Sequence, residues 1–145
     1  MENFTDRHNK KVKCFRNYMD KFRETFKAYV GEDINADWIK SAREHFAKGV
    51  EFEEVVGLYD TSSFGKGKSG LLFTDNFLYW KRAFSKGIIR MEDIEQITYY
   101  DESQKKDTDR GIVFHLKNGS LIQWDGFCNL KCGEFIKFMN EYIKI

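Results

Sequence analysis

Residues 65–69, with the sequence GKGKS, carry the residue types that bind phosphate in many nucleotide-binding loops. That motif also requires a glycine at position 62, where this chain has Ser62. It further requires a helix after the serine, whose amide dipoles meet the phosphate, whereas residues 71–74 have the composition of a β-strand. The sequence therefore argues against ATP or GTP binding.

The same stretch also predicts a basic rim. Lys66 and Lys68 lie in the loop, and Lys81 and Arg82 lie at the far end of the hairpin that follows it. Together these four cations could hold a phosphate group or an anionic lipid head, at about 1 kcal/mol for each cation near a charged surface. The alternative, which we favour, is a solvated loop that keeps a sheet edge soluble.

A metal site is a weaker hypothesis. Cys128 and Cys132 are spaced to share one helix face, and His8, His45 and His115 could complete a zinc site. Structural zinc sites generally need two close-spaced pairs of ligands, and only one is present. Small apolar residues facing a core explain both cysteines better, so we predict no metal and no cofactor.

Catalytic signatures are also weak. His115 and Asp125 are the one acid and histidine pair close enough in sequence to consider, and no nucleophile elbow or pair of catalytic carboxylates is visible. The sequence therefore favours a non-enzymatic protein.

The element that must position these residues is a hairpin over residues 70–81, with the sequence GLLFTDNFLYWK. Its two apolar runs flank Asp75-Asn76, which tolerate a tight turn. If Thr74 lies opposite Phe77, alternation places one set of side chains on the core face: Leu71, Phe73, Leu78 and Trp80. Leu72 and Tyr79 then lie on the outer face.

Two helices are predicted before any strand. The first covers residues 5–30 and the second begins at an Asn35 cap and ends near Gly49. The first is predicted from an apolar stripe with gaps of three and four, formed by Val12, Phe15, Met19, Phe22, Phe26 and Tyr29. Phenylalanine at several of these positions favours docking on a domain over a regular coiled coil.

After residue 50 the pattern becomes strand-like. Strands are predicted at 55–59, 70–74, 77–81, 87–90, 94–100, 111–116 and 120–124, and a final helix carries Cys128 to Ile143 on one face. The predicted fold class is α+β: a seven-stranded, antiparallel, bent sheet or partly open barrel capped by the C-terminal helix and preceded by two N-terminal helices. The predicted division is a helical extension over 1–49 and a domain over 50–145.

The segment from Leu58 to Lys81, the run GIIRMEDIEQI, and GIVFHLKNGSLIQW with its closing helix together resemble the bacterial pleckstrin-homology-like (PH-like) and GRAM-like domains. The resemblance covers about residues 50–145. In eukaryotic members the loop after the first strand grips inositol phosphates through lysines, which implies a ligand role for Lys66 and Lys68. The chain departs from the lipid-binding pattern at Gly70, where an arginine is expected. The scaffold serves lipid binders, peptide binders and structural modules, so it implies no single activity.

Excess apolar surface favours protein contacts. If Lys117 pairs with Ser120 across the Asn118-Gly119 turn, the outer face of the last hairpin carries Val113, His115, Ile122 and Trp124. Together with Leu72 and Tyr79, these are the predicted protein-interaction residues. An antiparallel sheet normally turns a polar face to water, so something should cover them, and the first helix, from this chain or a second copy, is the nearest candidate.

Composition limits the class of partner. The formal net charge is +1, which disfavours nucleic-acid binding by bulk attraction. No window is apolar enough for a membrane span, no signal peptide is recognised, and three cysteines do not make a disulfide framework. We therefore expect a cytoplasmic binding or adaptor module acting through a protein partner or a homodimer. The alternative is binding to an anionic membrane surface or phosphate through the basic loop.

Overall fold

The computed structural model describes residues 4–21, 27–61, 67–82, 85–101, 110–125 and 132–145. Within these ranges it contains helices α1 (Phe4–Tyr18), α2 (Ala36–His45) and α3 (Cys132–Tyr142) and three short 3-10 turns, η1 (Gly31–Asp33), η2 (Phe52–Glu54) and η3 (Met91–Asp93). The strands are β1 (Lys27–Val30), β2 (Val55–Asp60), β3 (Gly70–Thr74), β4 (Phe77–Arg82), β5 (Ser85–Arg90), β6 (Ile94–Asp101), β7 (Arg110–Leu116) and β8 (Leu121–Asp125). None of the described helices has the length and apolar character needed to cross a bilayer.

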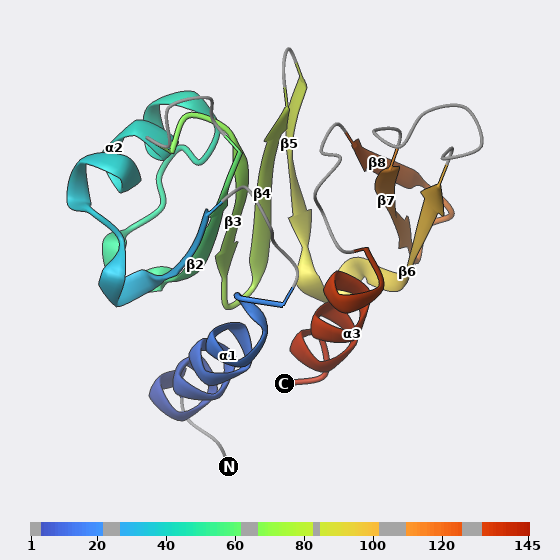
Figure 1. The fold of residues 1–145 in the computed structure, drawn as a ribbon, viewed down its shortest axis with the longest axis horizontal. Helices are drawn as coiled ribbons and strands as arrows, with labels where there is room; N and C mark the ends of the chain where they lie inside the picture. The colour runs from blue at the N-terminus through green and yellow to red at the C-terminus, as the bar shows by residue number, and fades with distance from the viewer. Residues whose placement is uncertain (1–3, 22–26, 62–66, 83–84, 102–109, 126–131) are drawn as a thin grey trace.

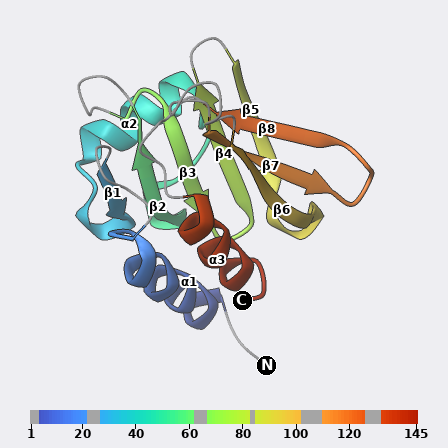
Figure 2. The same cartoon turned by 45° about the vertical axis from the view of Figure 1, so that its right-hand side comes forward.

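The fold is α+β, as predicted, but its strands form two sheets. A five-stranded antiparallel sheet has the order β1-β2-β3-β4-β5, and a three-stranded antiparallel sheet has the order β6-β7-β8 (Figures 1 and 2). The chain passes from β5 to β6 through η3, so consecutive strands belong to different sheets. The predicted single sheet is therefore wrong, and the described strands do not close into a barrel.

The β3–β4 hairpin has the predicted register. Leu71 pairs with Trp80, Leu72 with Tyr79, and Phe73 with Leu78. The Thr74 hydroxyl closes the turn, since it accepts a hydrogen bond from the Phe77 N–H at 3.1 Å. The predicted core face is also confirmed: its first three members are fully buried, and Trp80 is half-buried against them.

The first helix is shorter than predicted. Helix α1 ends at Tyr18, and residues 27–30 form strand β1, which pairs antiparallel with β2. Tyr29, the last position of the predicted helical stripe, therefore lies on a strand, and Phe22 and Phe26 lie outside the described residues. Helix α2 begins as predicted, because the Asn35 side chain accepts a hydrogen bond from the Asp37 N–H at 2.8 Å.

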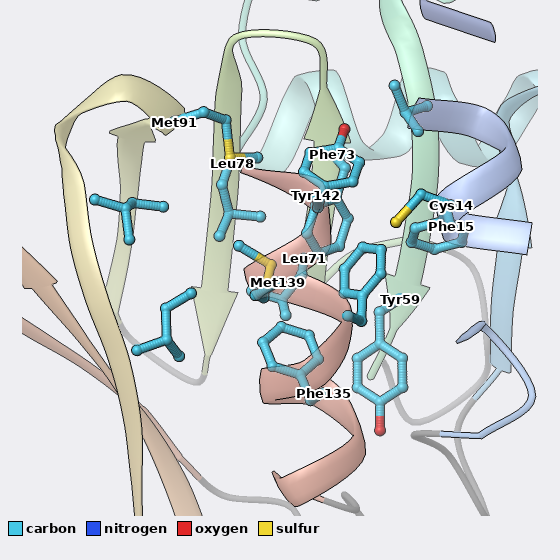
Figure 3. Close-up of a cluster of buried hydrophobic side chains, with 14 of the residues drawn as sticks. Cys14, Phe15, Tyr59, Leu71, Phe73, Leu78, Met91, Phe135, Met139 and Tyr142 are labelled. Atoms are coloured by element: carbon cyan, nitrogen blue, oxygen red, sulfur yellow. The ribbon is translucent and has the colours of Figure 1, made fainter. Parts of the chain in front are cut away.

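Helices α1 and α3 pack against the inner face of the five-stranded sheet. Phe15 of α1 and Phe138 of α3 meet Phe73 of β3 with ring centroids 5.4 to 5.6 Å apart. Figure 3 shows the side chains of α3 directed at this face, among them Phe135, Met139 and Tyr142. Because α3 also contacts β6 and β7, one core joins both sheets.

Helix α2 covers the outer face, and this corrects two predictions. Leu72 is fully buried and Tyr79 is 9% exposed, in a second cluster with Ile39 and Ala42 of α2. These residues needed a cover, and α2 supplies it (Figure 1), whereas α1 packs on the opposite face through Phe15. Leu72 and Tyr79 are therefore core residues and present no surface to a partner.

The second hairpin is shifted by one residue from its predicted register. His115 pairs with Leu121 and Phe114 with Ile122, and the Leu116 N–H donates to the Ser120 carbonyl at 2.9 Å. Since side chains alternate along a strand, a slip of one residue exchanges the two faces of β8. Ile122, predicted on the outer face, therefore packs against the core, and its neighbour Leu121, which the predicted register would place inside, is 60% exposed.

The outer face of the second sheet is consequently less apolar than predicted. Val113 is only 9% exposed, and His115 is half-buried with its Nε2 atom 2.7 Å from the Thr98 hydroxyl. The backbone of Trp124 pairs with Ile112, and the Trp124 side chain lies outside the described part of the chain. The four outer-face residues predicted on this hairpin therefore do not form one exposed surface.

Candidate functional site

The predicted basic rim is assembled only in part. Lys68 is exposed and lies two residues before the start of β3, and Lys81 and Arg82 are half-buried at the end of β4. Lys66 lies outside the described residues. The pairing of Gly70 with Lys81 brings the two chain segments to the same end of the hairpin. An acid also lies here, because the buried Asp60 carboxylate accepts a hydrogen bond from the Gly67 N–H at 3.1 Å.

This geometry does not resemble a phosphate-binding loop. The amide of Gly67, which an anion would need, is bonded to a carboxylate, and Lys68 and Ser69 lead into strand β3 and not into a helix. The structure also explains the departure at Gly70. Its φ is +135°, and a Cβ atom there would lie 2.0 Å from the Tyr59 carbonyl oxygen, so an arginine cannot occupy this position without moving the backbone.

The three histidines lie on separate elements, and each contacts a different residue. His8 of α1 contacts Asp75, His45 of α2 contacts its own helix carbonyl at Ser41, and His115 contacts Thr98. Among the described side chains no group of three potential ligands is gathered. Cys128 lies outside the described residues, as does the Cys132 side chain.

His115 and Asp125 are not brought together as a catalytic pair. His115 pairs with Leu121 at one end of the β7–β8 ladder, and Asp125 pairs with Gly111 at the other end.

A buried polar cluster fastens α1 to the β3–β4 turn. His8 Nδ1 lies 2.7 Å from Asp75 Oδ1, and Lys11 donates to the Asp75 carbonyl. The Lys11 ammonium also lies 4.7 Å from the Tyr142 ring centroid, and the Tyr142 hydroxyl donates to the Thr74 carbonyl at 2.9 Å. Lys11 is 1% and Asp75 3% exposed, whereas the His8 side chain is 18% exposed, and the cluster holds α1 and α3 on the sheet.

The Lys11 ammonium should make stability depend on pH. Burial, and to a smaller extent the charge of Arg7, lowers the pKa of Lys11 to about 8, although Asp75 acts in the opposite direction. The unfolded chain keeps this proton up to the ordinary pKa of 10.5, so it binds more protons than the folded protein between these values. Stability contributed by this group therefore rises with pH across that window.

We expect the difference in unfolding free energy between wild type and Lys11→Met to grow by about 1 kcal/mol between pH 8 and pH 9 in favour of the wild type. Urea unfolding at the two pH values measures it, with Lys13→Met as the exposed control on the same helix. Cys14 also titrates differently in the folded protein, because burial raises the pKa of its thiol to about 12. The stability that the Cys14 thiol contributes is lost only as the pH rises above its ordinary pKa of 9.0, which is the upper limit of this experiment. A difference that stays constant with pH would contradict the prediction.

A second candidate site, which we name the α2–β5 face, combines cations with exposed apolar side chains. It is formed by Lys40, Arg43, Glu44, His45, Phe46, Lys48, Phe52, Lys86 and Ile88. Two adjoining hollows of about 550 and 460 Å³ lie on it and share three lining residues, Arg43, Glu44 and Lys48. These volumes fall within the range of ligand-binding clefts. Among the charged groups of the face, four are cationic and Glu44 is acidic.

The apolar part of this face arises from the way α2 covers the sheet. One row of side chains crosses the outer face of the five-stranded sheet through consecutive backbone pairs: Tyr29, Leu58, Leu72, Tyr79 and Ile88. Helix α2 buries Leu58, Leu72 and Tyr79, but the last member of the row, Ile88 on β5, is 57% exposed. The face therefore contains an apolar position that the chain itself leaves uncovered.

Ile88 was missing from the predicted interaction residues, although the sequence contains a signal for it. Ile88 and Ile89 are adjacent in a strand, so one of them must point away from the core. Ile89 is 2% exposed and fills the core position. The sequence cannot reveal that α2 stops short of β5, because that depends on how the helix docks.

Comparisons of the chain with protein-family models, with curated proteins and with solved structures find no match.

Proposed function

We propose that the chain is a cytoplasmic, non-enzymatic binding module with a PH-like fold, and that it acts through protein contacts at the α2–β5 face. The fold part of the proposal is supported by the order of the elements. Strands β2 to β8 are seven consecutive strands that pair antiparallel within two sheets, and helix α3 follows them. This is the element order that the resemblance to PH-like domains implies.

The observation that carries the binding part is the exposure of Ile88 beside the hollow of about 460 Å³. The apolar row across the sheet is covered by α2 at its inner members and ends uncovered at this residue. A partner that places an apolar side chain on Ile88 would extend the layer that α2 begins. Fully burying an exposed isoleucine contributes about 1.5 to 3 kcal/mol, and because Ile88 is 57% exposed, the share still to be gained is about 0.9 to 1.7 kcal/mol.

The test is selection of a random peptide library displayed on phage against the immobilised chain. We expect the selected peptides to bind Ile88→Glu at least about tenfold more weakly than wild type, since 1.4 kcal/mol corresponds to a factor of ten. Leu121→Glu is the matched control, because Leu121 is equally exposed on the other sheet. Selected peptides that bind Ile88→Glu as well as they bind wild type would refute the α2–β5 face as the binding site.

Anionic phospholipid or phosphate binding by Lys66, Lys68, Lys81 and Arg82 is the alternative function. Asp60 beside Gly67 places negative charge where this ligand would bind, so we favour protein contacts. Flotation with phosphatidylserine vesicles separates the two functions. Recovery of the chain with these vesicles, lost in Lys68→Glu and kept in Ile88→Glu, would establish the alternative.

A further inference from the structure

We propose that the partner at the α2–β5 face is an acidic protein segment that adds to β5 as an extended strand, with an apolar residue against Ile88 and acidic residues on either side of it. This inference rests on the proposed function and names the chemistry of its partner.

The backbone of β5 supplies the first step. In the five-stranded sheet β5 pairs with β4 along its whole length, from Arg82 with Ser85 to Phe77 with Arg90. Its other edge has no partner strand among the described residues. Such an edge presents N–H and C=O groups to which an extended peptide can pair, and main-chain hydrogen bonds then provide affinity.

The side chains of β5 specify what this strand should carry. Lys86, Ile88 and Arg90 alternate along β5, so they share one face of the sheet. All three are exposed, and the Arg90 guanidinium also pairs with the carboxylates of Glu92 and Asp93, with which an acid on the added strand would share it. An added strand places its own side chains opposite these positions, so the matching pattern is acid, any residue, apolar, any residue, acid. This pattern is symmetric and therefore fits a parallel or an antiparallel strand.

Charge around Ile88 favours an acidic segment over a neutral or basic one. Arg43 and Lys48 line the same hollow as Lys86, and Glu44 is the one acid in that lining. The Lys86 ammonium is held near the end of α2, since it donates to the His45 carbonyl at 3.3 Å. Carboxylates of a docked strand would therefore meet several cations from two elements.

The same charges disfavour a second copy of this chain as the occupant. Pairing of two β5 strands edge to edge would bring the cations of one copy, Lys86 and Arg90, close to those of the other. Like charges on paired strands are destabilising, and lysine on an edge strand is a common protection against self-association. The charges of β5 therefore disfavour pairing with the β5 strand of a second copy and favour pairing with a negatively charged strand.

The experiment is an NMR titration of the full chain with three capped seven-residue peptides. The first is Thr-Glu-Thr-Val-Thr-Glu-Thr, and the second has lysine in place of both glutamates. The third has the same residues as the first in another order, with Glu-Val-Glu in consecutive positions. We expect the first to bind at least tenfold more tightly than the other two and to slow amide hydrogen exchange across residues 85–90. Lys86→Glu should reduce the preference for the first peptide over the second, whereas Lys117→Glu, at an exposed turn, should leave it unchanged.

Several results would overturn the inference. Two of them come from the titration: equal binding of the acidic and basic peptides, or slowed amide hydrogen exchange only outside residues 85–90. The other two are binding of phosphatidylserine vesicles with no peptide binding, and a concentration-dependent dimer that Ile88→Glu abolishes. If the library instead yields peptides that need Ile88 but lack acidic residues, the proposed function stands and this inference fails. If no selected peptide depends on Ile88, the proposed function itself fails.

Discussion

Phe15→Ala is expected to lower the free energy of unfolding by about 3 to 5 kcal/mol, the usual cost of removing a buried phenylalanine. Phe15 is fully buried, and its ring lies 5.4 Å from that of Phe73 and 5.6 Å from that of Phe138. It therefore joins α1 to the sheet and to α3 at one point. Loss of this side chain leaves a cavity beside the two remaining rings and weakens the docking of the whole helix.

Urea unfolding followed by circular dichroism measures the effect. Lys13→Ala is the matched control, since Lys13 is exposed on the same helix and its replacement should change stability by no more than about 0.5 kcal/mol. If Phe15→Ala costs less than 1 kcal/mol, α1 is not an integral part of the core. Its docking would then be a separate, weak equilibrium.

The β3–β4 hairpin could be predicted because its determinants are local. Asp75-Asn76 mark the turn, and strict alternation on both sides fixes which residues face the core. The register of Leu71 with Trp80 follows from these two facts alone and agrees with the structure. The Asn35 cap of α2 was predictable for the same reason, since a capping residue acts on amides two residues away.

The β7–β8 hairpin shows how little is needed to reverse a prediction. Asn118-Gly119 was interpreted as a two-residue turn, but the loop contains three residues. Gly119 takes a φ of +90°, and Asn118 Oδ1 accepts a hydrogen bond from the Ser120 N–H at 2.8 Å. One extra loop residue shifts the register and exchanges Leu121 with Ile122 between the two faces. Local sequence signals do not distinguish these two loop lengths.

Strand β1 and the α2–β5 face could not be predicted because they depend on contacts distant in sequence. The four residues of β1 are a strand through pairing with β2, about thirty positions further along the chain. In isolation Tyr29 fits the helical stripe equally well. Likewise, Ile88 is an exposed residue only because α2 covers β2 to β4 and ends before β5.

Gly57→Ala should be the second most damaging of the substitutions considered, at about 2 to 3 kcal/mol. A Cβ atom at Gly57 would lie 2.5 Å from the Phe15 ring, which is closer than such atoms approach in proteins. No positive φ is required at Gly57, so the cost should come from this contact. Gly133→Ala is the control, because a Cβ atom there meets nothing within 4 Å.

A double-mutant cycle with Phe15→Ala separates the contact from a backbone effect. If the methyl group is excluded by the Phe15 ring, Gly57→Ala should cost less than about 1 kcal/mol once the ring is removed, and the two substitutions should be coupled by at least that amount. Gly57 also follows a register shift in the pairing of β2 with β3. If glycine is needed for that irregularity, the cost will persist unchanged in the Phe15→Ala background. Equal costs in the two backgrounds would therefore show that the backbone of β2, and not the docking of α1, requires glycine here.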